Sequence, residues 1–164
     1  MKRFFVLTLT LLLLCAALGE SDQFALRNGI AWGMSAEEVL KREGNPAHET
    51  DKENGLDIVR IPKAEHEGAA CTLEYLFFDG TLAMIRADYG KDAALEDLKD
   101  ALSKQYGEAT RLTREQLREL TMDEDPADTF YGWVLDSYTL VCLTADTAAG
   151  TLRVLYCDIV ATEG

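Results

Sequence analysis

Two segments carry apolar residues at the spacing of an amphipathic helix. The first helix is predicted to begin at Ser35, because Glu38 stands three residues later and completes a capping box. A hydrophobic staple and a Gly-Asn-Pro stop mark its two ends: Met34 with Val39, then Gly44, Asn45 and Pro46. The second helix is predicted over 92–106 from Leu95, Leu98, Leu102 and Tyr106, with Gly107 as its stop. The segment from Thr113 to Gln116 predicts the start of a third, short helix.

Alternating and β-branched runs predict six strands between and after these helices. They are Ile58–Ile61, Cys71–Phe78, Thr81–Tyr89, Thr129–Leu135, Tyr138–Thr144 and Leu152–Ile159. At Asp79-Gly80 we expect a hairpin with a three-residue loop and Gly80 as a left-handed bulge residue. This register brings one clean apolar set together, with Leu73, Tyr75 and Phe77 opposite Ala83, Ile85, Ala87 and Tyr89.

The last three strands are predicted to share one apolar face if Cys142 pairs with Cys157. That face would carry Tyr131, Trp133, Leu135, Tyr138, Leu140, Cys142, Leu155, Cys157 and Ile159. The order of elements is then helix and three strands, twice, over 35–89 and 92–160. Neither half has enough apolar surface to fold alone. The sequence therefore predicts an α+β fold in which two tandem α-β-β-β units form one antiparallel sheet, with both helices packed on one face.

A sheet covered by helices on one side leaves its other side bare. On the predicted register, that second face carries several large apolar side chains: Leu76, Phe78, Leu82, Met84, Val134, Val141 and Leu143. This is more apolar surface than contact with solvent requires, and it predicts a protein partner or self-association. Trp32, just before the first helix, is either an interface anchor or a residue that packs beneath that helix.

The first residues have the three regions of a secretory signal peptide. Lys2 and Arg3 precede an uncharged apolar run from Phe4 to Leu14, and small residues before Glu20 offer a cleavage site. The run is shorter than the roughly 20 residues that span a bilayer. We therefore expect a signal peptide at 1–19 and one exported domain at 20–164. The alternative is a lipid anchor at Cys15, although the bulky Leu14 fits a lipoprotein cleavage box poorly.

The chain carries 29 acidic and 16 basic residues, a net charge of −13. Such a surface repels phosphate backbones and anionic lipid, so we expect neither nucleic-acid binding nor stable membrane insertion. Three cysteines follow the predicted cleavage site, and none forms a Cys-x-x-Cys pair. Cys142 and Cys157 form either a cross-strand disulfide or two buried thiols. Cys71 is expected to be a buried structural thiol rather than a nucleophile.

Candidate chemistry elsewhere is sparse. His48 and His66 lie in polar segments beside glutamates, where a metal site or general base is conceivable but solvated loop residues are expected. The acidic loop Met122 to Asp128 offers oxygen ligands for calcium, yet Pro126 and the missing glycine depart from an EF-hand loop. We expect no catalytic residues, no metal and no cofactor, and no phosphate or nucleotide fingerprint is present.

The string from Gly33-Met34-Ser35 through Val39 to Gly44-Asn45-Pro46 resembles a motif of the SmpA/BamE-like family of small outer-membrane assembly lipoproteins. It is also similar to the repeat unit of β-lactamase inhibitor protein, which has two tandem helix-plus-sheet modules. The second copy, ending at Ala109, lacks the Gly-Met-Ser and the proline. The resemblance implies a binding module, and it transfers no functional residues.

These observations predict a secreted, non-enzymatic protein-binding or inhibitor-like module. Two alternatives remain: an extracytoplasmic metal-dependent hydrolase that uses His66 and the acidic loop, and a small-ligand binder that uses the concavity of the sheet.

Overall fold

The computed structural model describes residues 26–90, 93–116, 127–135 and 139–158. Eight antiparallel strands in these segments form one sheet in the order β1-β2-β3-β4-β8-β7-β6-β5. The strands are β1 (Glu49–Glu53), β2 (Leu56–His66), β3 (Ala69–Phe78), β4 (Thr81–Tyr89), β5 (Thr110–Arg111), β6 (Thr129–Val134), β7 (Thr139–Asp146) and β8 (Thr151–Asp158). The helical segments with both ends described are the 3-10 turn η1 (Arg27–Gly29) and the α-helices α2 (Ala36–Arg42) and α3 (Leu95–Tyr106). Residues 114–116 are also helical, which confirms the predicted helix start after Thr113.

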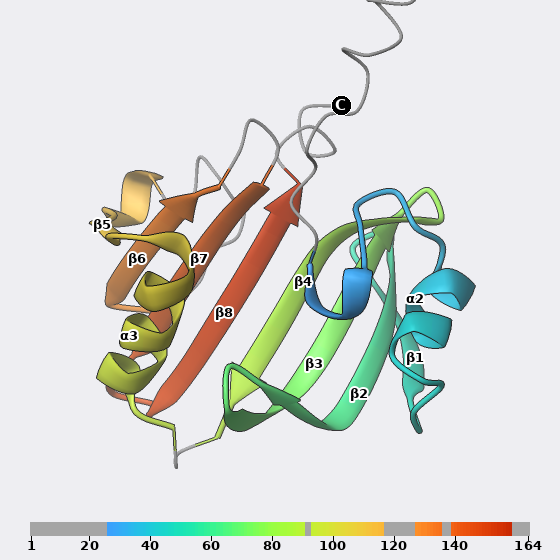
Figure 1. Ribbon diagram of the computed structural model, residues 1–164, viewed down its shortest axis with the longest axis horizontal. Helices are drawn as coiled ribbons and strands as arrows, with labels where there is room; N and C mark the ends of the chain where they lie inside the picture. The colour runs from blue at the N-terminus through green and yellow to red at the C-terminus, as the bar shows by residue number, and fades with distance from the viewer. Residues whose placement is uncertain (1–25, 91–92, 117–126, 136–138, 159–164) are drawn as a thin grey trace, which may run out of the picture.

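The helices α2 and α3 lie on the same face of the sheet, which we call the helix face (Figure 1). Val39 of α2 and Leu98 and Leu102 of α3 belong to one buried cluster with side chains from β2, β3, β4, β6, β7 and β8. The predicted α+β class is confirmed. α2 and α3 are each followed by four strands rather than the predicted three, and the two sets of strands meet where β4 pairs with β8.

The start of α2 is the best-specified local structure, and it follows the prediction. Ser35 Oγ accepts a hydrogen bond from the Glu38 amide at 3.4 Å, and the Glu38 carboxylate accepts one from the Ser35 amide at 2.9 Å. Val39 is fully buried, and Gly44 takes the left-handed conformation (φ 79°) that ends the helix. Trp32 packs inside rather than at an interface, where its indole nitrogen donates to Thr139 Oγ1 at 2.9 Å.

Three parts of the sheet were not predicted: the continuation of β2 beyond Ile61, strand β1 and the two-residue strand β5. β2 continues through Pro62 to His66, because the proline sits at a register shift between Ile61 and Ala64, where a missing amide hydrogen is tolerated. β1 has the sequence Glu-Thr-Asp-Lys-Glu and is exposed along its length. It carries no apolar pattern because it is an edge strand, and charged side chains on an edge oppose pairing with other molecules.

The β3–β4 hairpin has the predicted pairing beyond its turn, but the extra residue lies elsewhere. Tyr75 pairs with Ile85 as expected. The turn itself is a two-residue Asp79-Gly80 turn with φ of 48° and 80°, and the bulge follows at Ala83. Leu82 therefore pairs with Phe77 and joins the buried cluster on the helix face. Its predicted place on the second face is wrong.

The β7–β8 hairpin is paired two residues away from the prediction. Cys142 lies opposite Leu155, and Cys157 lies opposite Leu140. Val141 and Leu143 point to the helix face and are fully buried, so their predicted place on the second face is also wrong. β7 is buried on both sides from Thr139 to Ala145, which removes the alternation that would reveal its orientation. The predicted face residues Tyr138 and Ile159 lie outside the described residues.

The second face of the sheet, opposite the helices, carries different side chains on its two sets of strands. Under β6, β7 and β8 it carries a buried cluster of Ala127, Phe130, Leu140, Cys142, Leu155 and Cys157. Across β2, β3 and β4 it carries an ion-pair row in which Glu74, only 4% exposed, lies between Arg60 and Arg86. Arg60 Nε and Arg86 Nε each donate to a different Glu74 oxygen at 2.5 Å.

Candidate functional site

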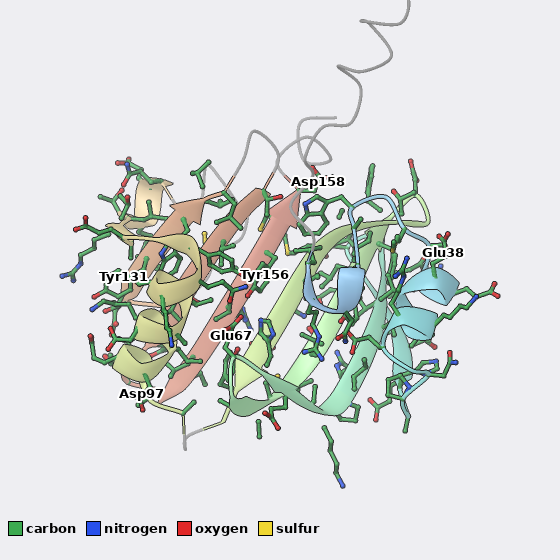
Figure 2. All side chains as sticks on the ribbon, viewed as in Figure 1. Glu38, Glu67, Asp97, Tyr131, Tyr156 and Asp158 are labelled. Carbon is green, nitrogen blue, oxygen red and sulfur yellow. The ribbon has the colours of Figure 1, made fainter. Side chains whose placement is uncertain are left out.

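A crevice of about 210 Å³ opens on the helix face between η1, the β2–β3 turn and the last turn of α3. Its floor is the centre of the sheet, where β4 meets β8. The lining residues are Leu26, Arg27, His66, Glu67, Ile85, Gln105, Tyr106 and Tyr156. Figure 2 shows Glu67 and Tyr156 beside one another in this region, between α3 and η1. The crevice thus lies where elements from distant parts of the chain meet.

Three side chains form the polar centre of the crevice. His66 Nε2 lies 2.9 Å from the Tyr156 hydroxyl, and the Tyr156 hydroxyl lies 3.5 Å from Glu67 Oε1. The His66 and Tyr156 rings meet edge to face with centroids 5.4 Å apart, and Tyr106 meets Tyr156 in the same manner at 6.5 Å. These contacts hold Tyr156 between a histidine, a carboxylate and a second tyrosine.

Arg27 forms a neighbouring charged contact and is held by two partners. Its Nε lies 2.9 Å from Glu43 Oε1, and its Nη1 donates to the Glu65 carbonyl at 2.8 Å. The Tyr75 hydroxyl donates to the same Glu43 carboxylate. The guanidinium charge is therefore balanced by Glu43, at the end of α2, and its position is fixed by the backbone next to His66.

Burial sets the protonation of these groups. Loss of solvent, with a smaller contribution from the Arg27 charge, lowers the pKa of His66 to about 4, so the ring is neutral at pH 7. Burial also raises the pKa of Glu67, against the opposing effects of the Tyr156 hydrogen bond and Arg27. The pKa of Tyr156 is raised, again chiefly by burial. At neutral pH the crevice holds the neutral imidazole of His66, beside the Arg27–Glu43 ion pair and the Glu67 side chain.

The neutral state of His66 predicts a loss of stability in acid. The groups that face the ring or adjoin it are Arg27, Glu67, Tyr89, Tyr106 and Tyr156. In the unfolded chain a histidine titrates near pH 6.5, so the unfolded state binds more protons between pH 6.5 and pH 4. The free energy of unfolding should therefore fall by about 3 kcal/mol as the pH decreases through this window. Urea denaturation at a series of pH values measures this.

The His66→Gln variant isolates the effect, because the difference between its pH profile and that of the wild type removes the opposing titration of Glu67. His48→Gln is the matched control: His48 is exposed, and its ring contacts the Pro46 carbonyl. Equal slopes in the wild type and in His66→Gln would contradict a buried, neutral His66.

The residues of the predicted partner-binding face lie on two different faces of the sheet, and most of them are buried. Leu76 is on the second face but buried, and Met84 is partly buried against the second-face cluster. Leu82, Val141 and Leu143 are in the helix-face core. Phe78 and Val134 remain as the exposed large apolar side chains of the described segments, at 47% and 71%, on β3 and β6. The continuous bare apolar face predicted from the sequence is not present.

Of the two alternatives for Cys142 and Cys157, a disulfide or two buried thiols, the structure has the buried thiols. Cys71, Cys142 and Cys157 are buried thiols. Burial raises the pKa of Cys71 to about 11 and that of Cys142 to about 12, so both are protonated at neutral pH and unreactive. Cys142 and Cys157 are diagonal rather than opposite neighbours on the paired strands.

His66 is the functional candidate whose position was predicted wrongly from the sequence. It was expected in a solvated loop, but it ends β2 and is only 9% exposed. The signal that was overlooked is Glu67-Gly68, a two-residue turn that implies strand on both sides. His48 is exposed as expected. Residues 122–126 of the acidic loop, residues 1–19 and Cys15 lie outside the described residues.

Within the described segments no three histidine, cysteine, aspartate or glutamate side chains converge as a metal site would require. No helix in that part of the chain has the length and apolar character needed to cross a bilayer. Comparison of the chain with protein-family models, with curated proteins and with solved structures gives no match. The resemblance to the SmpA/BamE-like and inhibitor-like proteins therefore stays a prediction from the sequence.

Proposed function

We propose that the protein is an exported, non-enzymatic binding module that receives a small polar group in the crevice on its helix face. The observation that carries the proposal is the crevice itself, where Tyr156, His66 and Glu67 form a connected polar centre on a rigid sheet. Binding sites of this kind combine an apolar lining with a few polar groups in fixed positions. Export rests on the signal-peptide pattern of residues 1–19.

The chemistry of the candidate residues favours binding over catalysis. A histidine whose pKa is lowered to about 4 is a weak base at neutral pH, and general bases work best when their pKa lies near the working pH. Cys71, the nearest thiol in sequence, has its pKa raised to about 11 and is a poor nucleophile. The hydrolase alternative uses His66 with the acidic loop, most of which lies outside the described residues, and His66 is poorly suited to act as its base.

The size of the crevice limits the occupant. Pockets for drug-sized ligands have volumes of about 300–1,000 Å³. The crevice, at about 210 Å³, is smaller. It therefore suits a small molecule or one side chain presented by another protein. This replaces the apolar second face as the proposed contact surface, because most of that face's predicted residues are buried.

We also propose that the two halves of the sheet are diverged copies of one unit. The strand order is symmetric about the β4–β8 pair, and an α-helix precedes each set of four strands. In this view the crevice forms where the copies meet, and neither copy alone has a complete site.

A tryptophan in the mouth of the crevice tests the proposal. Gln105 lines the crevice from an exposed position on α3, so Gln105→Trp should fill the mouth without disturbing the core. Lys104→Trp is the matched control, because Lys104 is exposed on the same helix turn and does not line the crevice. Thermal-shift measurements with a panel of small amines, carboxylates and sugars would show which compounds stabilise each protein.

We expect at least one class of compound to raise the melting temperature of the wild type and of Lys104→Trp, but not of Gln105→Trp. The proposal is overturned if no compound stabilises the wild type at millimolar concentration, or if every active compound stabilises Gln105→Trp equally.

A further inference from the structure

We propose that the group bound in the crevice is an alkylammonium, with the Glu67 carboxylate as its counter-ion and the rings of Tyr106 and Tyr156 as its walls. This inference rests on the proposed function and names the chemistry of its ligand. A free amine and a lysine side chain share that chemistry.

The charge distribution is the first argument. Arg27 is committed to Glu43 and to the Glu65 carbonyl. Among the described residues, no lysine or arginine lies within ion-pairing distance of Glu67, and its titratable neighbour His66, 3.9 Å away, is neutral at pH 7. The crevice therefore holds one partly desolvated carboxylate that pairs directly with no lysine or arginine of the described residues, and on which the Arg27 charge acts only from a distance. A bound anion would face this carboxylate, whereas a bound cation would neutralise it.

The backbone at Glu67 is the second argument. Three hairpin turns in the first half of the sheet have the same left-handed pair of conformations, at Asn54-Gly55, Glu67-Gly68 and Asp79-Gly80. Asparagine, aspartate and glycine are the residues that favour the first position of such turns. Glutamate is not among them, and Glu67 has φ 51°. The longer side chain at this turn extends its carboxylate to within 3.5 Å of the Tyr156 hydroxyl.

The aromatic lining is the third argument. Ammonium groups are attracted to the faces of aromatic rings, most strongly where solvent is excluded. Tyr106 and Tyr156 both line the crevice. The chain already uses this interaction once on the same helix, where the Lys99 ammonium lies 5.1 Å from the centroid of the Tyr131 ring. A net charge of −13 also raises the local concentration of small cations at the surface.

Isothermal titration calorimetry at pH 7.5 with three isosteric probes tests the inference. The probes are butylammonium, 1-butanol and butyrate, which differ in charge but little in size. We expect butylammonium to bind and butyrate not to bind. Two further arms separate the sources of the amine: a short peptide with one central lysine, and the same peptide with norleucine in its place. Tighter binding of the lysine peptide than of butylammonium assigns the site to a partner protein.

Variants at two equivalent turns provide the control. Glu67→Asn removes the carboxylate and places a favoured residue in the turn, so we expect a melting temperature no lower than that of the wild type and binding of butylammonium weakened by at least about tenfold. Asp79→Asn removes the same charge at the matching position of the β3–β4 turn, and it should leave binding unchanged.

The outcomes are distinguishable. Equal binding of butylammonium to the wild type and to Glu67→Asn, or equal weakening by Asp79→Asn, overturns the inference. If butyrate or butanol binds the wild type better than butylammonium, and Gln105→Trp blocks it, the inference fails while the proposed function stands. If none of the probes or panel compounds binds, both fail.

Discussion

Replacing Leu143 with aspartate is expected to unfold the protein. Leu143 lies in the middle of β7, is fully buried and packs in the helix-face core. The substitution removes a leucine and places an ionisable group among apolar side chains, which costs at least about 4 kcal/mol. Circular dichroism during urea denaturation would measure the loss. Leu143→Ala, which should cost about 2–5 kcal/mol, gives a measurable value if the aspartate variant does not fold at all.

Val134→Asp is the control for this experiment. Val134 belongs to the same predicted apolar face but is 71% exposed, so the aspartate there should change the free energy of unfolding by no more than about 0.5 kcal/mol. A Leu143→Asp protein as stable as Val134→Asp would show that β7 presents Leu143 to the surface. The partner-binding face predicted from the sequence would then return as the better account.

Replacing Glu74 with glutamine is expected to destabilise the sheet by about 3 to 5 kcal/mol. The Glu74 side chain is 4% exposed and holds Arg60 and Arg86 on either side, on the second face of the sheet. Without the carboxylate, the two guanidinium groups face each other across β3. They keep only longer contacts, of 3.7 to 3.9 Å, to more exposed carboxylates: Glu49 and Asp51 for Arg60, and Glu53 and Asp88 for Arg86. The cost comes from leaving two partly buried guanidinium groups without their close anion, more than from the loss of the ion pairs themselves.

Two further variants identify the cause. Asp57→Asn breaks a pair with Lys52 in which both side chains are more than half exposed, and we expect no measurable change. The triple variant Arg60→Met, Glu74→Leu, Arg86→Met removes all three charges and should recover most of the stability lost in Glu74→Gln. If Glu74→Gln alone is as stable as the wild type, solvent must already screen this row of charges.

The sequence predicts well the parts of the fold that depend on residues close together in the chain. The capping box at Ser35 and the glycine stops at Gly44 and Gly107 place both α-helices within a few residues. The pairing of Tyr75 with Ile85 follows from an apolar pattern that only one register satisfies. The α+β class follows from these elements together.

The parts that were missed depend on tertiary context. β7 is apolar throughout, so no period-two pattern could tell which side meets the helices, and the orientation is set by its neighbours β6 and β8. β1 is polar because it is an edge, so it does not resemble a strand. His66 appeared to follow the end of a strand at Pro62, whereas a register shift lets that strand continue.

The candidate site was least accessible to sequence reasoning. Arg27, His66 and Tyr156 are separated by long stretches of chain and are brought together only by the packing of η1 and the β2–β3 turn over the β4–β8 pair. No motif spans them. The one local sign was the glutamate in a turn where asparagine or aspartate is favoured.

The edge strands of the sheet limit the ways in which another molecule can bind to it. One edge strand is β1, which has five residues, four of them charged, and the other is β5, which has two residues. Binding by strand addition needs a long edge strand whose backbone amide and carbonyl groups are free to pair with a peptide. Neither edge strand of the described part of the chain offers this. A peptide that binds by extending the sheet, or a fibre built by edge-to-edge association of copies, therefore has no suitable starting point on these two strands.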